Sequence, residues 1–395
     1  MTQNYRKTLY ACFIGYIVQA IVNNFAPLLF IRFQNEFDIS LAKITLLVTF
    51  NFGIQLFVDF ISAYFIDKIG YRAAIVMAHI FSAAGLACMT FLPSLFKDPF
   101  IGLLVSVMIY AVGGGIIEVL VSPIAEACPT EHKEKTMSLL HSFYCWGHVG
   151  VVLISSIFFR VFGIENWRIL AVIWLMVPLF NVFLFMKVPI ISLSDNETAM
   201  SPGILIRQKV FWLFVLLMLC AGASEQAVSQ WASTFAEMGL GVNKTLGDLM
   251  GPMFFAILMG TSRTIYGKFG HKFDLDKFML FSGILCIISY IVISVSPWPL
   301  LSLLACGICG LSVGIMWPGT FSMAAAAMKG GQTAMFAYLA LAGDLGCMSG
   351  PTFVGFISGA ANDNLKLGIL SAIIFPLLLV IGIPAAKRSR MAGQS

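Results

Sequence analysis

The chain has 395 residues, of which 59% are hydrophobic and only 11% are charged. A soluble domain carries about a quarter charged residues, so this composition excludes an ordinary water-soluble protein and indicates a chain dissolved in lipid. The net charge of +5 does not indicate a nucleic-acid partner. Membrane proteins collect Lys and Arg in cytoplasmic loops, and no basic run here has the length of a binding patch.

Apolar runs of about 20 residues predict twelve transmembrane helices and hence an all-α membrane protein. These runs lie at 8–31, 43–66, 73–93, 100–125, 136–160, 168–187, 210–235, 248–267, 277–295, 300–325, 332–358 and 366–386. The first run is too long for the apolar region of a signal peptide, so it is expected to remain as a span.

A polar segment divides the chain nearly in half. We therefore expect an N-terminal six-helix bundle over 1–187, a cytoplasmic linker over 188–209, and a C-terminal six-helix bundle with a short basic tail over 210–395. If both termini are cytoplasmic, the segments on that side hold more than twice as many Lys and Arg residues as the opposite segments. The positive-inside rule therefore predicts that both tails are cytoplasmic.

The cysteine and histidine pattern predicts neither a metal site nor a cofactor. Most of the nine cysteines lie inside apolar runs, where free thiols behave as small hydrophobes. Cys306 and Cys309 have the spacing of a metal or redox pair, but no second pair accompanies them. His141, Cys145 and His148 share one helix face, yet no carboxylate completes a ligand set.

An internal repeat relates the two halves. The segment 65–72, which holds Asp67, Gly70 and Arg72, aligns with 265–272, and both lie between the second and third span of their half. In the same way, 146–148 in the fifth span aligns with 342–344 in the eleventh. Paired six-helix repeats of this kind are typical of secondary transporters.

At these residues the chain resembles the major facilitator superfamily. The run Asp67-Lys68-Ile69-Gly70-Tyr71-Arg72 is similar to the signature of the loop between its second and third helices. The sequence departs from that signature at Ala63, where Gly is usual, and at Tyr71, where a basic residue is usual. The resemblance implies a carrier, not an enzyme, in which helices 1, 4, 7 and 10 line a central cavity.

Within the superfamily, the chain resembles the fucose permease branch of sugar:proton symporters. The similar stretches are Asn23-Asn24 with 33–37, the run 113–118 that ends in Glu118 and is followed by Ser122-Pro123, and 140–147. One departure concerns helix 1, because Ala26 and Pro27 stand where that branch has an acidic residue. The resemblance implies symport of a carbohydrate-like solute with protons, although it does not support a proton relay on helix 1.

Glu118 is the strongest candidate for proton coupling. A charge in the middle of the bilayer costs about 2.5–3.5 kcal/mol on insertion scales, so it needs a reason. Glu118 lies near the middle of its span, after three glycines that allow close helix approach. The alternative is a neutral Glu hydrogen-bonded to a neighbouring helix. Glu225, Asp344 and His148 are further candidates; His148 and Asp344 hold matched repeat positions, so a polar pair between the halves is conceivable.

Amides and aromatic rings inside spans are the candidate solute-binding groups, because amides offer both donors and acceptors to hydroxyl groups and an indole can stack on the apolar face of a sugar. The alternative for each is helix packing or interhelical hydrogen bonding. The candidates are Gln19, Asn23, Asn24, His141, Gln226, Gln230, Trp231 and Trp317.

Four residues are candidates for gating: Asp67, Gly70, Arg72 and Arg263. Asp67 could face the N-terminus of the helix that begins near Gly331, and such a contact would form in one conformation only. Arg263 lies inside a span and therefore needs a carboxylate partner or a solvated cavity.

Other functions are weighed against this one. An efflux antiporter, a facilitative uniporter and a membrane-embedded transferase remain alternatives, but the only loop candidate for catalysis is 131–134, which a solvated loop explains better. The linker is too short for a signalling domain. We expect a multi-pass protein of the plasma (inner) membrane that works as a monomer and has a small solute, protons and the lipid bilayer as its partners.

Overall fold

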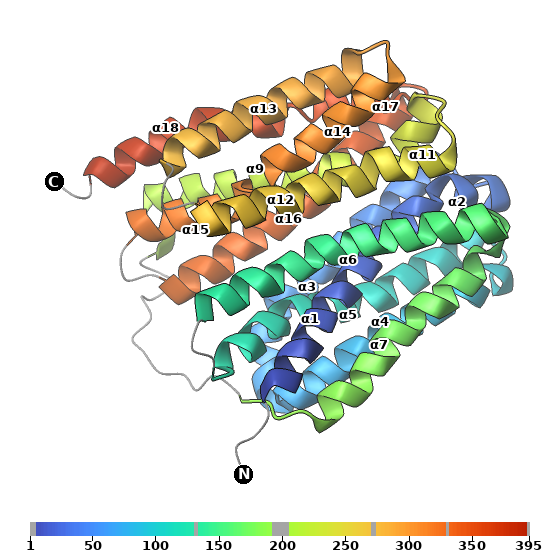
Figure 1. Ribbon diagram of the computed structural model, residues 1–395, viewed down its shortest axis with the longest axis horizontal. Coiled ribbons are helices and arrows are strands. Elements are labelled where there is room, and N and C mark those ends of the chain that lie inside the picture. The colour runs from blue at the N-terminus through green and yellow to red at the C-terminus, as the bar shows by residue number, and fades with distance from the viewer. Residues whose placement is uncertain (1–4, 130–132, 192–204, 270–273, 329–331, 393–395) are drawn as a thin grey trace. The chain divides into compact units, whose positions relative to one another are not determined.

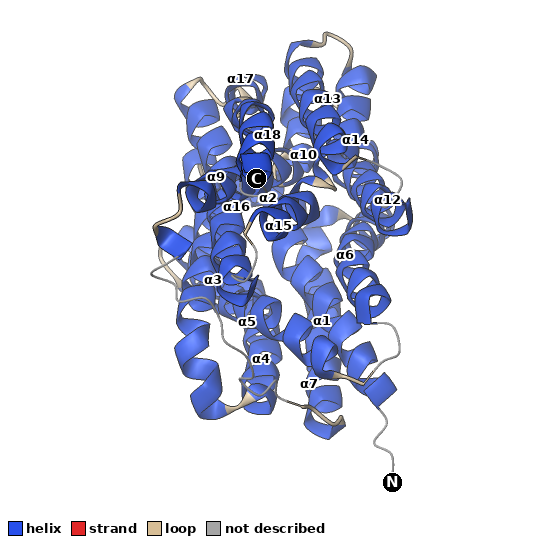
Figure 2. Cartoon of the chain, turned by 90° about the vertical axis from the view of Figure 1, so that its left-hand side faces the viewer, coloured by secondary structure: helices blue, strands red, loops and turns tan. Residues whose placement is uncertain are grey.

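The computed structural model describes residues 5–129, 133–191, 205–269, 274–328 and 332–392. Every regular element among these residues is helical, as Figure 2 shows. The chain forms two compact units, Met1–Asp195 and Asn196–Ser395, which are described separately below. The boundary between them falls inside the segment 188–209, whose exact limits as a linker stay a prediction. Most of that segment, 192–204, lies outside the described residues.

The first unit begins with a long helix that contains a 3₁₀ turn, followed by five further spans (Figure 1). Its elements are α1 (Tyr5–Asn24), η1 (Ala26–Leu29), α2 (Phe30–Phe37), α3 (Leu41–Ile69), α4 (Tyr71–Leu95), α5 (Pro99–Ala127), α6 (Lys133–Phe162), η2 (Ile164–Asn166) and α7 (Trp167–Lys187).

The second unit has more interruptions in its helices. Its elements are α9 (Lys209–Ser229), α10 (Ala232–Thr234), the π-helical turn η3 (Phe235–Gly239), α11 (Lys244–Asp248), the π-helical turn η4 (Leu249–Met253), α12 (Phe254–Phe269), α13 (Leu275–Val295), α14 (Pro299–Val313), α15 (Met316–Ala327), α16 (Gln332–Ala360), α17 (Leu365–Ser371) and α18 (Ile374–Ala392).

Both units use the same pairs of neighbouring helices. In the first unit α1 packs on α6, while α5 packs on α3 and α4. In the second, α9 packs on α16, while α14 packs on α12 and α13. In each unit, the first span packs on the fifth, and the fourth packs on the second and third. The repeat seen in the sequence is therefore accompanied by a repeat in helix packing.

The described residues contain 11 helical segments long and apolar enough to cross a membrane. The remaining predicted span, 248–267, falls on the continuous run of α11, η4 and α12. Large apolar side chains point outward from the spans: Phe60 is 61% exposed, Phe180 57% and Ile381 69%. In water such a surface would be unfavourable, so its solvent is lipid. The prediction of an all-α membrane protein is confirmed.

Several spans predicted as single helices are interrupted where proline removes a backbone donor. Pro27 lies in the 3₁₀ turn between α1 and α2. Pro318 follows the break between α14 and α15, and Pro376 follows the break between α17 and α18. The predicted spans 8–31, 300–325 and 366–386 therefore each contain or adjoin a break that apolar run length alone does not reveal.

Glycines bring helix backbones into direct contact within each unit. A Cβ at Gly85 of α4 would collide with the backbone of α5 at Tyr110. A Cβ at Gly346 of α16 would collide with the backbone of α9 at Leu219 and Ala223. Small residues at such crossings are how membrane helices pack closely without a hydrophobic driving force between them.

Candidate functional site within the spans

Glu118 of α5 is positioned by the three glycines that precede it. A Cβ at Gly113 would collide with Ser82 and Ala78 of α4. A Cβ at Gly114 would press on side chains of α1 and α3, and a Cβ at Gly115 would press on α3 alone. Successive positions of one helix thus face three neighbours, and the missing side chains let all three approach. As a result, Glu118 lies beside polar groups of α1 and α3.

A continuous chain of hydrogen-bonded polar side chains extends from Glu118. Gln19 Nε2 donates to Glu118 Oε2 at 3.1 Å and to Gln55 Oε1 at 2.8 Å. Gln55 Nε2 donates to Asn23 Oδ1 at 2.8 Å, and Asn51 Nδ2 donates to the same oxygen at 3.1 Å. The four amide residues are each at most 5% exposed. The structure therefore brings the predicted residues Gln19, Asn23 and Glu118 into one network.

Two amides of this network, Asn51 and Gln55, were not among the predicted site residues. Asn51, Gln55 and Asp59 lie four residues apart on α3 and form a polar stripe on an otherwise apolar helix. The stripe was visible in the sequence, because residues at i, i+4 and i+8 share one helix face. At its end, a carboxylate oxygen of Asp59 lies within 4.8 Å of one of Glu118. Two acidic groups therefore meet inside the first unit.

The other predicted residues of the first unit have separate surroundings. Asn24 Nδ2 donates to the Ala20 carbonyl of its own helix at 2.9 Å. His141 is exposed, and its ring lies 5.3 Å from that of Tyr16, whose hydroxyl is hydrogen-bonded to Ser122 at 2.9 Å. His148 is 2% exposed on α6.

Glu225 and Arg263 form the central ion pair of the second unit. Arg263 Nη2 of α12 lies 3.1 Å from Glu225 Oε2 of α9. Their side chains are 20% and 9% exposed. The predicted need of Arg263 for a carboxylate partner is thus met by a second predicted residue. An intramembrane charge is tolerated when it is paired in this way.

The same arginine also uses a backbone carbonyl that proline has freed. Pro318 has no N–H to donate to the carbonyl four residues earlier, which is that of Gly314. Arg263 Nε donates to this carbonyl at 3.3 Å. Arg263 therefore connects α9 with the break between α14 and α15.

Gln226 and Gln230 extend the hydrogen bonding of Glu225 along the end of α9, whereas Trp231 is buried against α16. Gln226 Nε2 donates to Glu225 Oε1 at 3.3 Å, and Gln230 Nε2 donates to Gln226 Oε1 at 3.1 Å. Trp231 is fully buried, and its indole N–H donates to the Pro351 carbonyl of α16 at 2.9 Å. This contact supports helix packing, the alternative that the sequence left open for Trp231.

Trp317 and Asp344 are neighbours in the second unit. A Cβ at Gly343 of α16 would collide with the Trp317 ring of α15, so the indole lies against the backbone one residue before Asp344. Trp317 and Asp344 are both half-buried. Their roles in solute binding and proton coupling stay predictions.

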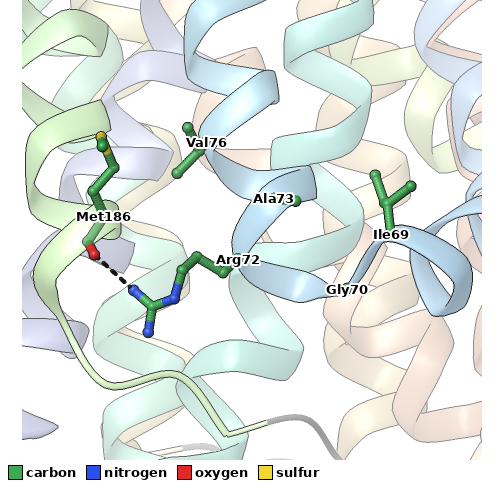
Figure 3. Close-up of a pocket in the computed structure, with 6 residues that line it drawn as sticks. All are labelled: Ile69, Gly70, Arg72, Ala73, Val76 and Met186. Carbon is green, nitrogen blue, oxygen red and sulfur yellow. Dashed lines mark hydrogen bonds between the residues drawn. The ribbon is translucent and has the colours of Figure 1, made fainter.

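The loop motif joins the start of α4 to the end of α7. Arg72 Nη1 donates to the Phe185 carbonyl at 2.7 Å and to the Met186 carbonyl at 3.1 Å, and Figure 3 shows the second of these bonds. Gly70 has φ +80°, a conformation that favours glycine, and ends α3 there. Gly70, Arg72 and Met186 line a shallow pocket of about 370 Å³. Asp67 is predicted to face the N-terminus of the helix that begins near Gly331. The side chain of Asp67 and the residue Gly331 both lie outside the described residues.

At the ends of two spans, an ion pair connects Lys43 in the first turn of α3 with Asp98, which lies just before α5. Lys43 Nζ donates to Asp98 Oδ2 at 2.8 Å, and Asp98 Oδ1 accepts the Phe100 amide at 3.1 Å as the N-cap of α5. The hydrogen bond from Lys43 lowers the pKa of the Asp98 carboxyl below its usual value, and the bond from the Phe100 amide acts in the same direction.

Two duplicated six-helix units with polar centres define a multi-pass membrane carrier. The family model of the Major Facilitator Superfamily matches residues 11–351. The chain belongs to this superfamily, and it is a transporter, not an enzyme. No curated protein sequence matches the chain.

Solved structures share the fold at low sequence identity. The fucose:proton symporter FucP of E. coli is 17% identical, with a TM-score of 0.67 over 97% of this chain and 99% of that one. A D-xylose-proton symporter is 14% identical, with a TM-score of 0.75 over 98% and 97%. A bacterial homologue of the human lysosomal transporter Spinster, inward-facing and unoccupied, is 15% identical, with a TM-score of 0.76 over 100% and 99%.

Proposed function

We propose that this transporter imports a small polar, carbohydrate-like solute by alternating access, together with protons that bind Glu118. The observation that carries the proposal is the hydrogen-bonded chain from Glu118 through Gln19 and Gln55 to Asn23. A carboxyl group and solute-binding amides in one network would let proton binding and solute binding influence each other. We place the protein in the plasma (inner) membrane as a monomer with both tails in the cytoplasm.

The amides of the chain suit a solute rich in hydroxyl groups. Each amide can donate and accept, so it can exchange its bond to a neighbouring amide for a bond to a sugar hydroxyl. Gln226 and Gln230 form a shorter series of the same kind on α9. Two of the solved structures that share the fold are a fucose:proton symporter and a D-xylose-proton symporter, which supports a carbohydrate as the first class to test.

The charged residues of the second unit and of the loop motif would control movement. Glu225 could take up a proton and release Arg263, which would loosen α9 from the break between α14 and α15. Asp344 and His148 are further proton-binding candidates. We expect Asp67, Gly70 and Arg72 to act at the cytoplasmic ends of the helices; Asp67→Asn should keep solute binding and slow transport.

The test is uptake of radiolabelled L-fucose and D-xylose into proteoliposomes under an imposed pH gradient. Import coupled to protons predicts accumulation of one of these sugars above the outside concentration, and loss of accumulation in Glu118→Gln. Lys97→Gln, an exposed change in a loop, is the matched control and should transport as the wild type does. Equal flux with and without the gradient would indicate a uniporter, and proton-driven extrusion would indicate an antiporter. Either result would overturn symport.

A further inference from the structure

We propose that Asp59 and Glu118 hold one proton between them, which makes Asp59 a second proton-binding residue of this transporter. This inference rests on the proposed proton coupling and extends it to a residue of the second span. The coupling site would then be a pair of carboxyl groups contributed by α3 and α5, not a single glutamate.

The geometry of the pair is the first argument. One carboxylate oxygen of Asp59 and one of Glu118 lie within 4.8 Å of each other, and both carboxylate oxygens of Asp59 are buried from solvent. Two negative charges at this separation repel each other strongly where water is scarce, so the favourable state of such a pair carries one proton. The cost of charge inside a bilayer acts in the same direction.

The second argument comes from Gln19, which points into the pair. Gln19 is 2% exposed, and its Nε2 donates to Glu118 and Gln55. Its Oε1 is a buried acceptor, and no donor among the described residues forms a hydrogen bond with it. A buried polar atom in this state is costly unless a donor reaches it in another state of the protein. A proton on the carboxyl pair supplies such a donor, because a protonated carboxyl group has an O–H.

The amide chain can carry this change to the solute-binding residues. When the pair is ionised, Gln19 presents Nε2 to it; when the pair is protonated, a half-turn of the Gln19 amide presents Oε1 instead. At present Gln55 accepts a hydrogen bond from Gln19 and donates one to Asn23. After a half-turn of the Gln19 amide, Gln55 would have to donate to Gln19 and accept from Asn23. Protonation at Asp59 and Glu118 would thereby alter what Asn23 offers to a solute.

The second unit provides an independent comparison. Asp59 lies on α3, which packs on α5; Arg263 lies on α12, which packs on α14, the equivalent pair of spans. Arg263 reaches the central acid Glu225 and the free carbonyl of Gly314. The second span of each unit thus places a charged side chain beside the acid at the unit's centre. In the first unit that side chain is itself an acid, so the first unit places two acids together where the second places an acid and a cation.

The helices α1, α4 and α6, which pack on α5, carry further titratable side chains. Tyr16 of α1 is hydrogen-bonded to Ser122 of α5, next to the pair along the helix. His79 of α4 is hydrogen-bonded to Asn181 of α7 and to the Ile75 carbonyl of its own helix. On α6, His148 is buried and His141 lies beside Tyr16.

The experiment measures protonation directly and requires no solute. Infrared absorption of protonated carboxyl groups is recorded on the purified full chain as the pH is raised. We expect a band in the wild type that disappears at a midpoint set by the pair. In Asp59→Asn and in Glu118→Gln the remaining acid should titrate with its midpoint shifted by more than about one pH unit, because a coupled pair titrates as a unit. Asp59→Glu should keep the wild-type band.

The control is Asp98→Asn, which removes an exposed carboxylate outside the spans and should leave the band unchanged. The proposal is overturned if Asp59→Asn titrates as the wild type does. If Asp59→Asn does not yield folded protein, Glu118→Gln gives the reciprocal test, since an unshifted Asp59 band would equally overturn the pair. If Asp59 and Glu118 titrate as a pair but no sugar is transported, only the proposed function is wrong. If protons drive sugar transport but the two acids titrate independently, only this inference is wrong.

Discussion

At the scale of single residues, the Glu225–Arg263 pair illustrates why charges inside a membrane protein come with partners. Each side chain is mostly buried, and Arg263 also holds the Gly314 carbonyl. Removing one member leaves the other charge unpaired, which costs about 3–5 kcal/mol for a buried pair, whereas removing both can be nearly neutral.

We therefore expect Arg263→Gln to lower the melting temperature in detergent clearly. The double variant Glu225→Gln with Arg263→Gln should recover much of the loss, because no unpaired charge remains. Thermal unfolding of the purified variants measures this. A double variant less stable than Arg263→Gln would show that the pair does not control stability.

Asp98 gives a residue-scale prediction for pH. Its pKa is lowered in the folded protein by Lys43 and the Phe100 amide, so its contribution to stability is present above the unfolded pKa and is lost as the pH falls through the folded pKa. Asp98→Asn should lower the melting temperature slightly at neutral pH and have a smaller effect in acid. Because Asp98 is exposed, the effect is small. A difference between the two proteins that grows in acid would contradict this account.

At the scale of helices, glycine positions decide how closely the elements approach. Gly85→Ala should destabilise the protein by about 1–3 kcal/mol, because the added carbon collides with the backbone of α5 at Tyr110 and neither helix can yield easily. Gly150→Ala on α6 is the matched control, since no atom lies within 4 Å of the added carbon. Alanine is the better helix former, so this change should be neutral or stabilising.

Thermal unfolding of Gly85→Ala and Gly150→Ala in the same detergent measures the difference. Equal melting temperatures would mean that α4 and α5 are not in backbone contact.

The elements also show which parts of the site could be predicted. Glu118, Gln19 and Asn23 were found because each is a polar residue in an apolar run. Asn51 and Gln55 were missed, and Asp59 was given no role, although their spacing places all three on one face of α3. Which face of a helix meets which neighbour depends on its rotation, and this is set by contacts such as those of Gly113, Gly114 and Gly115. Such contacts are not visible in run length or hydropathy.

At the scale of the whole molecule, the class of fold was predictable because the solvent imposes it. Every backbone polar group in lipid must be satisfied within its own segment, so apolar runs of span length have to be helices. The repeat and the loop motif then indicated two related halves and the superfamily. The breaks at Pro27, Pro318 and Pro376 could have been placed from the missing N–H groups, but the π-helical turns η3 and η4 have no comparable signal in the sequence.

The whole-molecule prediction concerns orientation. Because Lys and Arg are concentrated in the segments on the side of the two termini, we expect epitope tags at residues 1 and 395 to be protected from added antibody in intact cells and accessible after permeabilisation. A tag in the loop near Lys97 should be accessible in intact cells. Accessibility of one terminal tag without the other would contradict an even number of spans.

The three adjoining glycines of α5 also limit how this protein can vary in length. Successive residues of an α-helix are rotated by about 100°, so one residue inserted or deleted between Gly115 and Glu118 would keep the helix but turn the carboxyl group away from Gln19. Elsewhere on α5 one apolar side chain can replace another with modest effect. Between Gly115 and Glu118, the number of residues matters more than their identity. A helix of the same composition with one residue more or fewer would place its carboxyl group against a different neighbouring helix.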